Sequence, residues 1–403
     1  MTIIWVNKRN WKHEGPIVHM ALLNAHSFTN LGIHSHFVVG AGDDSSTEDD
    51  LIDHYGLQPH PLLAIHRIPR GKQGDKKTSS QPIFRYATRL ARQLGQSQNV
   101  IVVSRDSGFL PTMARLCRYK KIHAYYELHD FYARQNWKEQ VRFRDRREQV
   151  LEWLFLRSIN GIICITEEMR KLYDQVFPGI QKITVPLGTS PFPKQEINKL
   201  RQKRTVFYVG HLQGKKGFST ILDIALPLKE RGIHLVCLGG YPNAVSRLRE
   251  NLKEKGLSDA IEIIPFQGPA GMHRQLDERA SLGLSLLEDD FYNRNLTCPV
   301  KVLDYLSHGI PVLATALPSN RELLDQAGIY TDSSLVSSII DQISNLLDDE
   351  NLYASAVEAS RARCQKLTWG TRALKLAEFF KTNHQLIPEA AFGRRTVSPK
   401  SDT

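Results

Sequence analysis

The 403-residue sequence has few cysteines and lacks a long apolar run. Its five cysteines are scattered, without a CxxC pair or a Cys/His group at metal-ligand spacing, so they exclude a disulfide scaffold and argue against structural zinc. No stretch reaches the roughly 18–20 uncharged apolar residues that cross a bilayer. The first residues, MTIIWVNKRNWKHEG, have no apolar segment after their basic residues, unlike a signal peptide. We therefore expect a cytoplasmic protein with buried thiols.

Low-complexity sequence is also scarce. With 41% hydrophobic and 24% charged residues, the composition is that of a globular protein and excludes collagen, coiled coil and wholesale disorder. The length exceeds one ordinary core and predicts two or three domains. The net charge is +11, and residues 115–147 hold ten basic but only four acidic residues. Such a bias attracts nucleic acid, an anionic membrane surface or a phosphorylated substrate, whereas a solvated helix face is the plain alternative.

Short β-branched runs alternate with helix-length segments along nearly the whole chain, which predicts parallel sheets covered by helices on both faces. One of the predicted helices is long and charged and lies around 137–159. Residues 189–204 interrupt this rhythm with two prolines and a polar, basic run. We predict an α/β protein of two doubly wound, Rossmann-like domains facing across a cleft. The predicted parts are a first domain at 1–188, a linker at 189–204, a second domain at 205–370, a helix at 371–386 that can cross back to the first domain, and a disordered tail at 387–403.

The segment YVGHLQGKKGF (208–218) predicts an anion site. A strand ends near Gly210, a loop carries Gly214, Lys215 and Lys216, and Gly217 opens a helix. In an open α/β sheet, ligands bind beyond the carboxyl ends of the strands, where helix N-termini favour negative charge. The loop matches neither the Walker pattern nor GxGxxG, and loose surface lysines are the alternative interpretation.

A second segment, LTCPVKVLDYLSHGIPVLAT (296–315), predicts a short helix. Pro299 fits its first turn, and Gly309 fits its C-terminal cap. Free N–H groups near Val300 and Lys301 suit a diphosphate, and the carboxylate of Asp304 suits ribose hydroxyls. An ordinary surface pair of Lys301 with Asp304 is the alternative.

One histidine, His129 in YYELHDF, follows a first-domain strand at the predicted cleft edge. A structural role and a catalytic role are both open for it.

These motifs resemble the retaining GT-B glycosyltransferases, in particular glycosyltransferase family 4. The family pattern V-G-R-L-x-x-x-K-G is similar to Val209–Leu212 followed by Lys216-Gly217, and P-x-K-x-x-E-Y-x-x-x-G-x-P-V is similar to 299–312. Weaker similarities are His129-Asp130, Cys164–Thr166 and Val185–Gly188. The resemblance spans about residues 1–325.

The resemblance implies transfer of a hexose-type sugar, with retention, from a UDP- or GDP-linked donor to a glycan, glycolipid or polysaccharide precursor. No cofactor and no metal are expected, because cations and helix N-termini neutralise the diphosphate. The implied catalytic residues are His129, Lys216 and His211. The implied donor-binding residues are Gly15, Gly210, Lys216, Gly217, Pro299, Val300, Lys301 and Asp304.

The sequence departs from the family at three positions. His211 stands for an arginine, Asp304 for a glutamate, and Leu296 for a second glutamate, which Glu288 or Asp289 could replace in space. These departures keep open a second interpretation, a non-catalytic nucleotide-sugar-binding partner subunit. Nucleic-acid binding lacks any supporting motif. The basic segment 115–147, with Tyr132 and Trp137 interleaved, predicts peripheral association with the inner, anionic face of a membrane or an anionic acceptor.

Overall fold

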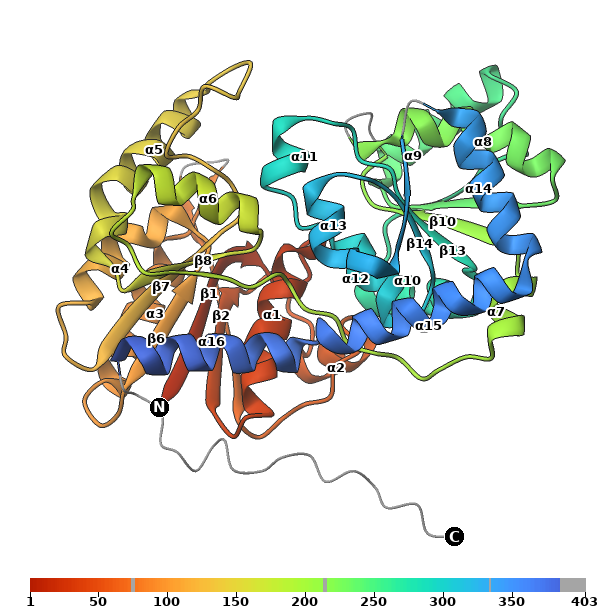
Figure 1. Ribbon diagram of the computed structural model, residues 1–403. Coiled ribbons are helices and arrows are strands. Elements are labelled where there is room, and N and C mark those ends of the chain that lie inside the picture. The colour runs from red at the N-terminus through yellow and green to blue at the C-terminus, as the bar shows by residue number, and fades with distance from the viewer. Residues whose placement is uncertain (74–76, 213–215, 333–334, 385–403) are drawn as a thin grey trace, which may run out of the picture.

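The computed structural model describes residues 1–73, 77–212, 216–332 and 335–384. The expected disordered tail, 387–403, and the loop residues Gly214 and Lys215 lie outside these ranges. Two parallel sheets with flanking helices form two bodies that lie side by side (Figure 1). This is the α/β architecture that the alternating pattern predicts.

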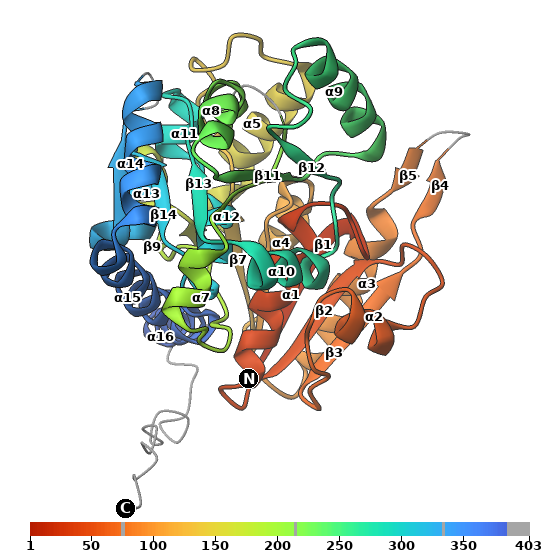
Figure 2. The ribbon, with the colours of Figure 1, turned by 90° about the vertical axis from the view of Figure 1, so that its right-hand side faces the viewer.

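The first sheet has seven parallel strands in the order β3-β2-β1-β6-β7-β8-β9. Its central strand β6 is buried from end to end, because the run VIVVS places apolar side chains on both faces. The strands are β1 (Thr2–Asn10), β2 (His34–Gly40), β3 (Leu63–Ile68), β6 (Val100–Ser104), β7 (Ile122–Leu128), β8 (Gly161–Cys164) and β9 (Lys182–Thr184). The helices are α1 (Pro16–Thr29), α2 (Thr47–Asp53), α3 (Gln81–Leu94), α4 (Leu110–Leu116), α5 (Phe143–Phe155) and α6 (Glu167–Val176). A short antiparallel ribbon, β4 (Gly71–Gln73) with β5 (Lys77–Ser79), extends from this domain (Figure 2).

The second sheet has six parallel strands in the order β12-β11-β10-β13-β14-β15. The strands are β10 (Thr205–Val209), β11 (His234–Leu238), β12 (Glu262–Ile264), β13 (Leu282–Ser285), β14 (Val312–Thr315) and β15 (Gly328–Thr331). The helices are α8 (Phe218–Glu230), α9 (Pro242–Glu254), α10 (Pro269–Arg279), α11 (Phe291–Asn295), α12 (Val300–Ser307), α13 (Pro318–Leu324), α14 (Val336–Asp348) and α15 (Glu350–Lys366).

Both sheets reverse their winding direction at one point. The reversal lies between β1 and β6 in the first sheet and between β10 and β13 in the second. In doubly wound sheets, the crevice beyond the carboxyl ends of the strands at this point is where ligands bind. The topology therefore selects the loops after β1, β10 and β13 as candidate site positions.

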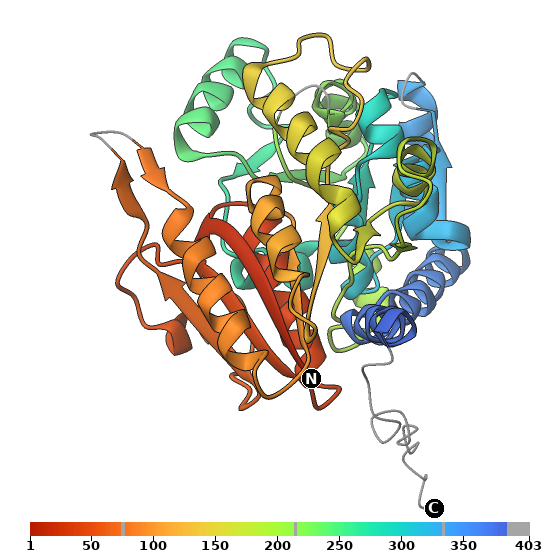
Figure 3. The ribbon, with the colours of Figure 1, turned by 90° about the vertical axis from the view of Figure 1, so that its left-hand side faces the viewer.

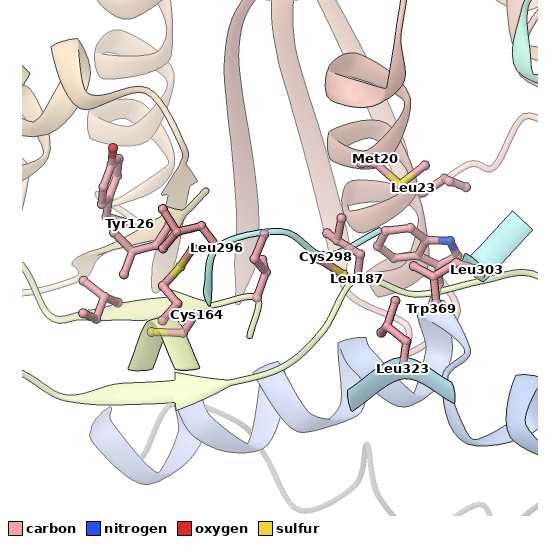
Figure 4. Packing of buried hydrophobic residues seen from close by; sticks show 14 of the residues in the cluster. Met20, Leu23, Tyr126, Cys164, Leu187, Leu296, Cys298, Leu303, Leu323 and Trp369 are labelled. Carbon is pink, nitrogen blue, oxygen red and sulfur yellow. The ribbon is translucent and has the colours of Figure 1, made fainter. Parts of the chain in front are cut away.

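One continuous cluster of buried apolar side chains joins the two domains (Figure 4). Leu296, Cys298 and Leu303 of the second domain pack with Met20 and Leu187 of the first. On the side seen in Figure 2, the Ala270 amide at the start of α10 donates to the His54 carbonyl at the end of α2. The interface between the domains thus combines apolar packing with backbone hydrogen bonds.

The chain passes between the domains twice. Residues 189–204 contain the short helix α7 (Ile197–Gln202) and lead into the second sheet. After α15 the chain returns as α16 (Trp369–His384), which packs on α1 with Phe380 against Phe28, 6.4 Å between ring centroids (Figure 1).

A buried arginine fixes α16 to the first domain. Arg372 is 2% exposed and donates to Glu127 Oε2 at 2.5 Å, to Asn24 Oδ1 at 2.7 Å and to the Pro186 carbonyl at 2.7 Å. It also donates to the Val185 carbonyl. Four acceptors from three separate segments therefore converge on one guanidinium.

Two expected helices differ in the structure. The helix expected around 137–159 is confined to α5, and residues 129–142 before it form bends, turns and irregular backbone. Pro299 is the N-cap of α12 and lies outside the first helical turn, in extended backbone with φ −73° and ψ 94°. Gly309 follows the C-cap with φ +68°, the left-handed conformation typical of a glycine that ends a helix.

We predict that Arg372→Met destabilises the protein by about 3–5 kcal/mol, because it leaves the Glu127 carboxylate buried without its cation. Urea unfolding followed by tryptophan fluorescence measures the loss. Lys375→Ala, at an exposed position on the same helix, is the matched control and should have little effect. Adding Glu127→Gln to the Arg372 variant should restore part of the stability; a double variant no more stable than Arg372→Met contradicts the pairing.

Candidate functional site

A cavity of about 280 Å³ lies between the domains at both reversal points. Its first-domain wall is the loop after β1 with the start of α1. Its second-domain wall consists of the loops after β10, β11, β12 and β13 together with the starts of α10 and α12. Eight of the ten sequence-predicted site residues line it, namely Gly15, Gly210, His211, Lys216, Pro299, Val300, Lys301 and Asp304. His129 and Gly217 are not among the lining residues.

Gly15 forms the N-cap of α1 with φ +89° and ψ 176°, a conformation essentially restricted to glycine. A Cβ built on it would meet no atom within 4 Å, so the backbone angle, and not crowding, requires glycine here. The 14-residue helix that follows directs its free N–H groups and positive dipole end towards this side of the cavity.

The loop after β10 depends on two glycines. Gly210 has φ +136° and lies 3.5 Å, measured from an added Cβ, from Nζ of Lys301. Gly217 has φ +82°, and an added Cβ would lie 1.6 Å from the Leu286 carbonyl oxygen. Glycine is therefore required at 217 because the loop packs directly against the Leu286 backbone. This contact explains why the motif contains Gly217 although the residue does not line the cavity.

Lys216 is held in place by side chains of α11 and the loop that follows it. Its Nζ donates to Asn293 Oδ1 at 2.8 Å and lies 4.8 Å from the centre of the Tyr292 ring. Burial lowers the pKa of Lys216 below its usual range, with Asp290 opposing this shift. The Lys216 Nζ also lies 3.4 Å from the Thr297 hydroxyl. Because three side chains hold Lys216 in place, it is not the loose surface lysine of the alternative interpretation.

Lys301 and Asp304 lie one turn apart on α12; Asp304 is buried, and Lys301 is half-buried with its ammonium group covered. Burial, with a smaller contribution from the charge of Lys216, lowers the pKa of Lys301 to about 7. Its Nζ lies 3.8 Å from the centre of the Tyr208 ring and has no hydrogen-bond acceptor in the described part of the chain. Burial raises the pKa of Asp304 to about 7. The two side chains form no ion pair in the structure as described, so they are not the surface pair of the alternative interpretation.

His211 lines the cavity beside both lysines. Partial burial, followed by the charges of Lys216 and Lys301, lowers its pKa below 6.5. The imidazole is therefore neutral near pH 7 while the cavity is empty of anions. The backbone around it is fixed by the Tyr208 hydroxyl, which donates to the His211 carbonyl at 2.8 Å and to the Lys216 carbonyl at 3.1 Å.

His129 belongs to a different network. Its Nε2 lies 2.6 Å from Glu127 Oε1, and Glu127 in turn binds Arg372. Burial, followed by the charge of Arg105, lowers the pKa of His129 to about 4 despite the nearby carboxylate. A neutral imidazole that donates from Nε2 leaves Nδ1 as a hydrogen-bond acceptor.

The positions around the missing family glutamate hold no replacement carboxylate. Leu296 is 1% exposed and packs in the interdomain cluster. Asp289 pairs with Arg294, and neither Glu288 nor Asp289 lines the cavity. The acids that line it are Glu14 and Asp304. Within the described ranges, no three His, Cys, Asp or Glu side chains gather as a metal site would require.

The sequence motifs missed several wall residues. Gly239 and Gly240 follow β11, and an added Cβ on Gly239 would lie 1.9 Å from the Gly210 carbonyl oxygen. The run HLVCLGG (234–240), a strand followed by two glycines, could have predicted that these two residues line the cavity. The remaining missed residues include Glu14, His19, Met20, Phe266, Met272 and Leu287, whose approach depends on how the domains pack.

The arrangement suits a ligand with a diphosphate and hydroxyl groups. Two half-buried lysines and two helix N-termini attract the anion, and buried Asp304 can accept hydrogen bonds from hydroxyls.

Residues 203–349 match the family model for glycosyl transferases group 1. No curated protein matches the chain.

Among solved structures, sucrose-phosphate synthase from Thermosynechococcus elongatus is 15% identical with a TM-score of 0.68, covering 95% of this chain and 99% of its own. Anabaena HepE in complex with UDP and glucose is 16% identical with a TM-score of 0.67, covering 95% of this chain and 100% of its own. A TarM variant from S. aureus, in complex with fondaparinux, α-GlcNAc-glycerol and UDP, is 11% identical with a TM-score of 0.68, covering 94% of this chain and 99% of its own.

At these identities the structural likeness establishes the fold, and the family match supports nucleotide-sugar transfer. The resemblance drawn from the motifs is thus confirmed: the second domain matches the group 1 glycosyl transferases, and the chain has the two-domain GT-B fold of glycosyltransferases.

Proposed function

We propose that the protein transfers a hexose-type sugar, with retention of anomeric configuration, from a UDP- or GDP-linked donor to a glycan, glycolipid or polysaccharide precursor. The observation that carries this proposal is the interdomain cavity with its two half-buried lysines, Lys216 and Lys301. Lys301 in particular is a buried ammonium group without an acceptor in the described part of the chain, which a donor diphosphate would supply. Desolvating such a group is costly unless it gains a partner.

In the proposed complex the donor lies mainly on the second domain. The diphosphate contacts Lys216, Lys301 and the N-terminus of α12, and Asp304 accepts hydrogen bonds from the ribose hydroxyls. Gly15 leaves room for a phosphate or the acceptor, and His129 Nδ1 accepts a hydrogen bond from the transferred sugar. His129 lies outside the wall of the cavity, so this last contact needs the sugar to extend towards β7.

The proposed reaction is a front-face substitution at the anomeric carbon. The bond from that carbon to the diphosphate oxygen breaks, and a bond to the acceptor oxygen forms on the same face. The departing phosphate oxygen takes the proton of the acceptor hydroxyl. The lysines stabilise the charge that develops on the leaving group, without a metal or cofactor, as preorganised electrostatic catalysis.

A non-catalytic donor-binding subunit is the second candidate, favoured by buried Leu296 where the family has a glutamate. Hydrolysis of a nucleotide sugar without acceptor separates the two, since only an enzyme releases free sugar. A thermal-shift panel of UDP-, GDP- and ADP-sugars identifies the donor, because a ligand at a hundred times its Kd stabilises by about 2.7 kcal/mol. Absence of any shift contradicts both candidates.

We further propose a cytoplasmic location with peripheral contact to the inner face of a membrane, and no nucleic-acid partner. The five cysteines are all free, which suits a reducing compartment. In the described part of the chain, no helix combines the length and hydrophobicity of a membrane span.

We predict that Lys216→Ala lowers turnover by about two to three orders of magnitude, comparable to the loss of one oxyanion donor. Steady-state kinetics with the donor identified by the panel measures this. Lys229→Ala, at an exposed position on α8, is the control and should behave as wild type. Turnover of Lys216→Ala within threefold of wild type places Lys216 outside the reacting complex.

Asp304→Asn should weaken nucleotide binding by about 1–3 kcal/mol, because a charge-assisted hydrogen bond is lost. The ionised carboxylate is the better acceptor, and its pKa in the free protein is about 7. Deprotonation of Asp304 should therefore favour binding as pH rises from 6 to 8, against the opposite effect of Lys301, whose pKa in the free protein is also about 7. Calorimetry of UDP and GDP should show a ratio of wild-type to variant affinity that grows with pH over this range, because the contribution of Lys301 is common to both proteins; equal affinity of wild type and variant at every pH would refute the ribose contact.

His211 should contribute to the loss of activity as pH rises, together with Lys301, whose pKa in the free protein is about 7. The lowered pKa of His211 makes the ring neutral at alkaline pH, so its cationic contribution to anion binding is lost as pH rises. His211→Arg keeps the charge and should flatten the alkaline fall of kcat/KM while leaving the acid limb in place. A pH profile identical to that of wild type would show that His211 does not contact the diphosphate.

A further inference from the structure

Helix α5 has an inverted distribution of polarity. Its buried residues are Asp145, Glu148 and Glu152, whereas Phe143 and Leu154 are 86% and 62% exposed. A surface helix ordinarily buries its apolar stripe and exposes its charges. Figure 3 shows α5, in yellow, on the outside of the first domain with no element covering its outer side. In the described part of the chain, Phe143 and Leu154 therefore stay largely exposed, whereas Trp153 on the same helix packs on Phe177 with ring centroids 5.1 Å apart.

The inward direction of the acids is fixed by specific bonds. Asp145 accepts from the Lys138 ammonium at 3.2 Å and caps the helix through the Arg142 amide at 3.0 Å. Glu148 accepts from the Ser107 hydroxyl. Glu152, whose pKa burial raises, accepts from the Tyr173 hydroxyl at 2.8 Å. Rotation of the helix to bury its apolar side would break all of these bonds.

The outward face has a regular spacing. Phe143, Arg147, Val150, Leu154 and Arg157 follow one another at intervals of four, three, four and three residues, and so lie on one side of the helix. Five of the thirteen exposed large hydrophobic side chains in the described ranges fall within 141–154. We call the following residues the α5 face: Val141, Arg142, Phe143, Arg144, Arg146, Arg147, Val150, Trp153, Leu154 and Arg157.

The α5 face is basic as well as apolar. Its charged members are all arginines, and the acids of the same helix are turned inward. A helix with an apolar stripe flanked by arginines suits the boundary between headgroups and acyl chains of an anionic bilayer. Aliphatic Val150 and Leu154 have no use against nucleic acid, which stacks on aromatic rings.

The structure also narrows the part of the basic segment 115–147 that can contact a membrane together with the start of α5. Arg115, Arg118, Lys120 and Lys121 precede β7, so a seven-residue strand of roughly 20 Å separates them from the loop that follows it and from Phe143 and Arg144 at the start of α5. They lie nearer to the end of α5, where Cys117 contacts Asn160. Of the interleaved aromatic residues, Trp137 stacks on Phe291 with ring centroids 5.0 Å apart. It therefore connects the domains and is not free for lipid.

We propose that the α5 face docks the protein on an anionic lipid bilayer. This deepens the membrane contact of the proposed function. The loop that leads into α5 touches α11 through Trp137, and α11 leads directly to residues 297–301 of the donor site. Docking through α5 thus brings the cleft close to the lipid surface, where an acceptor carried on an anionic lipid would be presented.

Flotation of the full-length protein with phosphatidylcholine vesicles containing 30% phosphatidylglycerol tests the surface, without nucleotide present. Wild type should bind at 50 mM NaCl, about tenfold less at 200 mM, and not to phosphatidylcholine alone. The pair Phe143→Ser/Leu154→Ser should lower binding at least tenfold at low salt, and so should Arg144→Glu/Arg146→Glu. Matched controls are Leu226→Ser/Leu352→Ser, two exposed leucines of the second domain, and Lys366→Glu/Lys375→Glu, two exposed lysines on α15 and α16.

Unfolding temperature and UDP affinity should be unchanged in the α5 variants, which separates this proposal from the donor site. Phe143→Trp leaves the face intact and should add a fluorescence signal quenched by brominated lipid. The proposal is overturned if wild type does not bind anionic vesicles, or if both control pairs lower binding as much as the α5 pairs. It is also overturned if light scattering shows a dimer that Phe143→Ser/Leu154→Ser dissociates, because the face would then bind a second copy.

Discussion

The packing of residues 296–303 against the first domain is the contact on which the site depends. Leu296, Cys298 and Leu303 belong to the cluster that joins the two domains, and the Thr166 hydroxyl donates to the Asn295 carbonyl at 2.6 Å. The same segment continues into α12, which carries Lys301 and Asp304. Anchoring this helix start in the interface fixes its position relative to both walls of the cavity. Leu296 thereby helps to hold the two domains together.

The electrostatic character of the cavity follows from burial more than from pairing. Lys301 and Asp304 each have a pKa near 7 because their charged forms are poorly solvated, and each moves from its ordinary value in the opposite direction. The empty site therefore holds its charges at a cost. An anion with adjacent hydroxyl groups relieves that cost at both residues together, which is a physical basis for preferring a nucleoside diphosphate over free phosphate.

Much of the second domain could be predicted from the sequence because its signals are local. Spacing within two short segments places the site residues at one edge of the sheet. Gly210 and Lys216 lie in the loop after a strand, and Pro299 and Asp304 lie at the start and in the first turns of a helix. The first-domain wall could not be predicted in this way, since His19 and Met20 reach the cavity only through the packing of α1 against the second domain. The position of His129 was equally inaccessible, because it depends on Arg372, which lies 243 residues further along the chain. The expected helix around 137–159 was too long, since the charges of residues 138–145 bind one another in a loop and cap.

The two passages of the chain between the domains run next to each other. The Thr189 amide donates to the Leu367 carbonyl at 2.8 Å, and the Trp369 amide donates to the Thr189 carbonyl at 3.1 Å. Gly188 allows this approach, since an added Cβ would lie 2.7 Å from Trp369. Two adjacent, mutually bonded passages resist twisting and sliding but permit bending about the line through them. The pair therefore keeps the two domains, and with them the two walls of the cavity, in one lateral register.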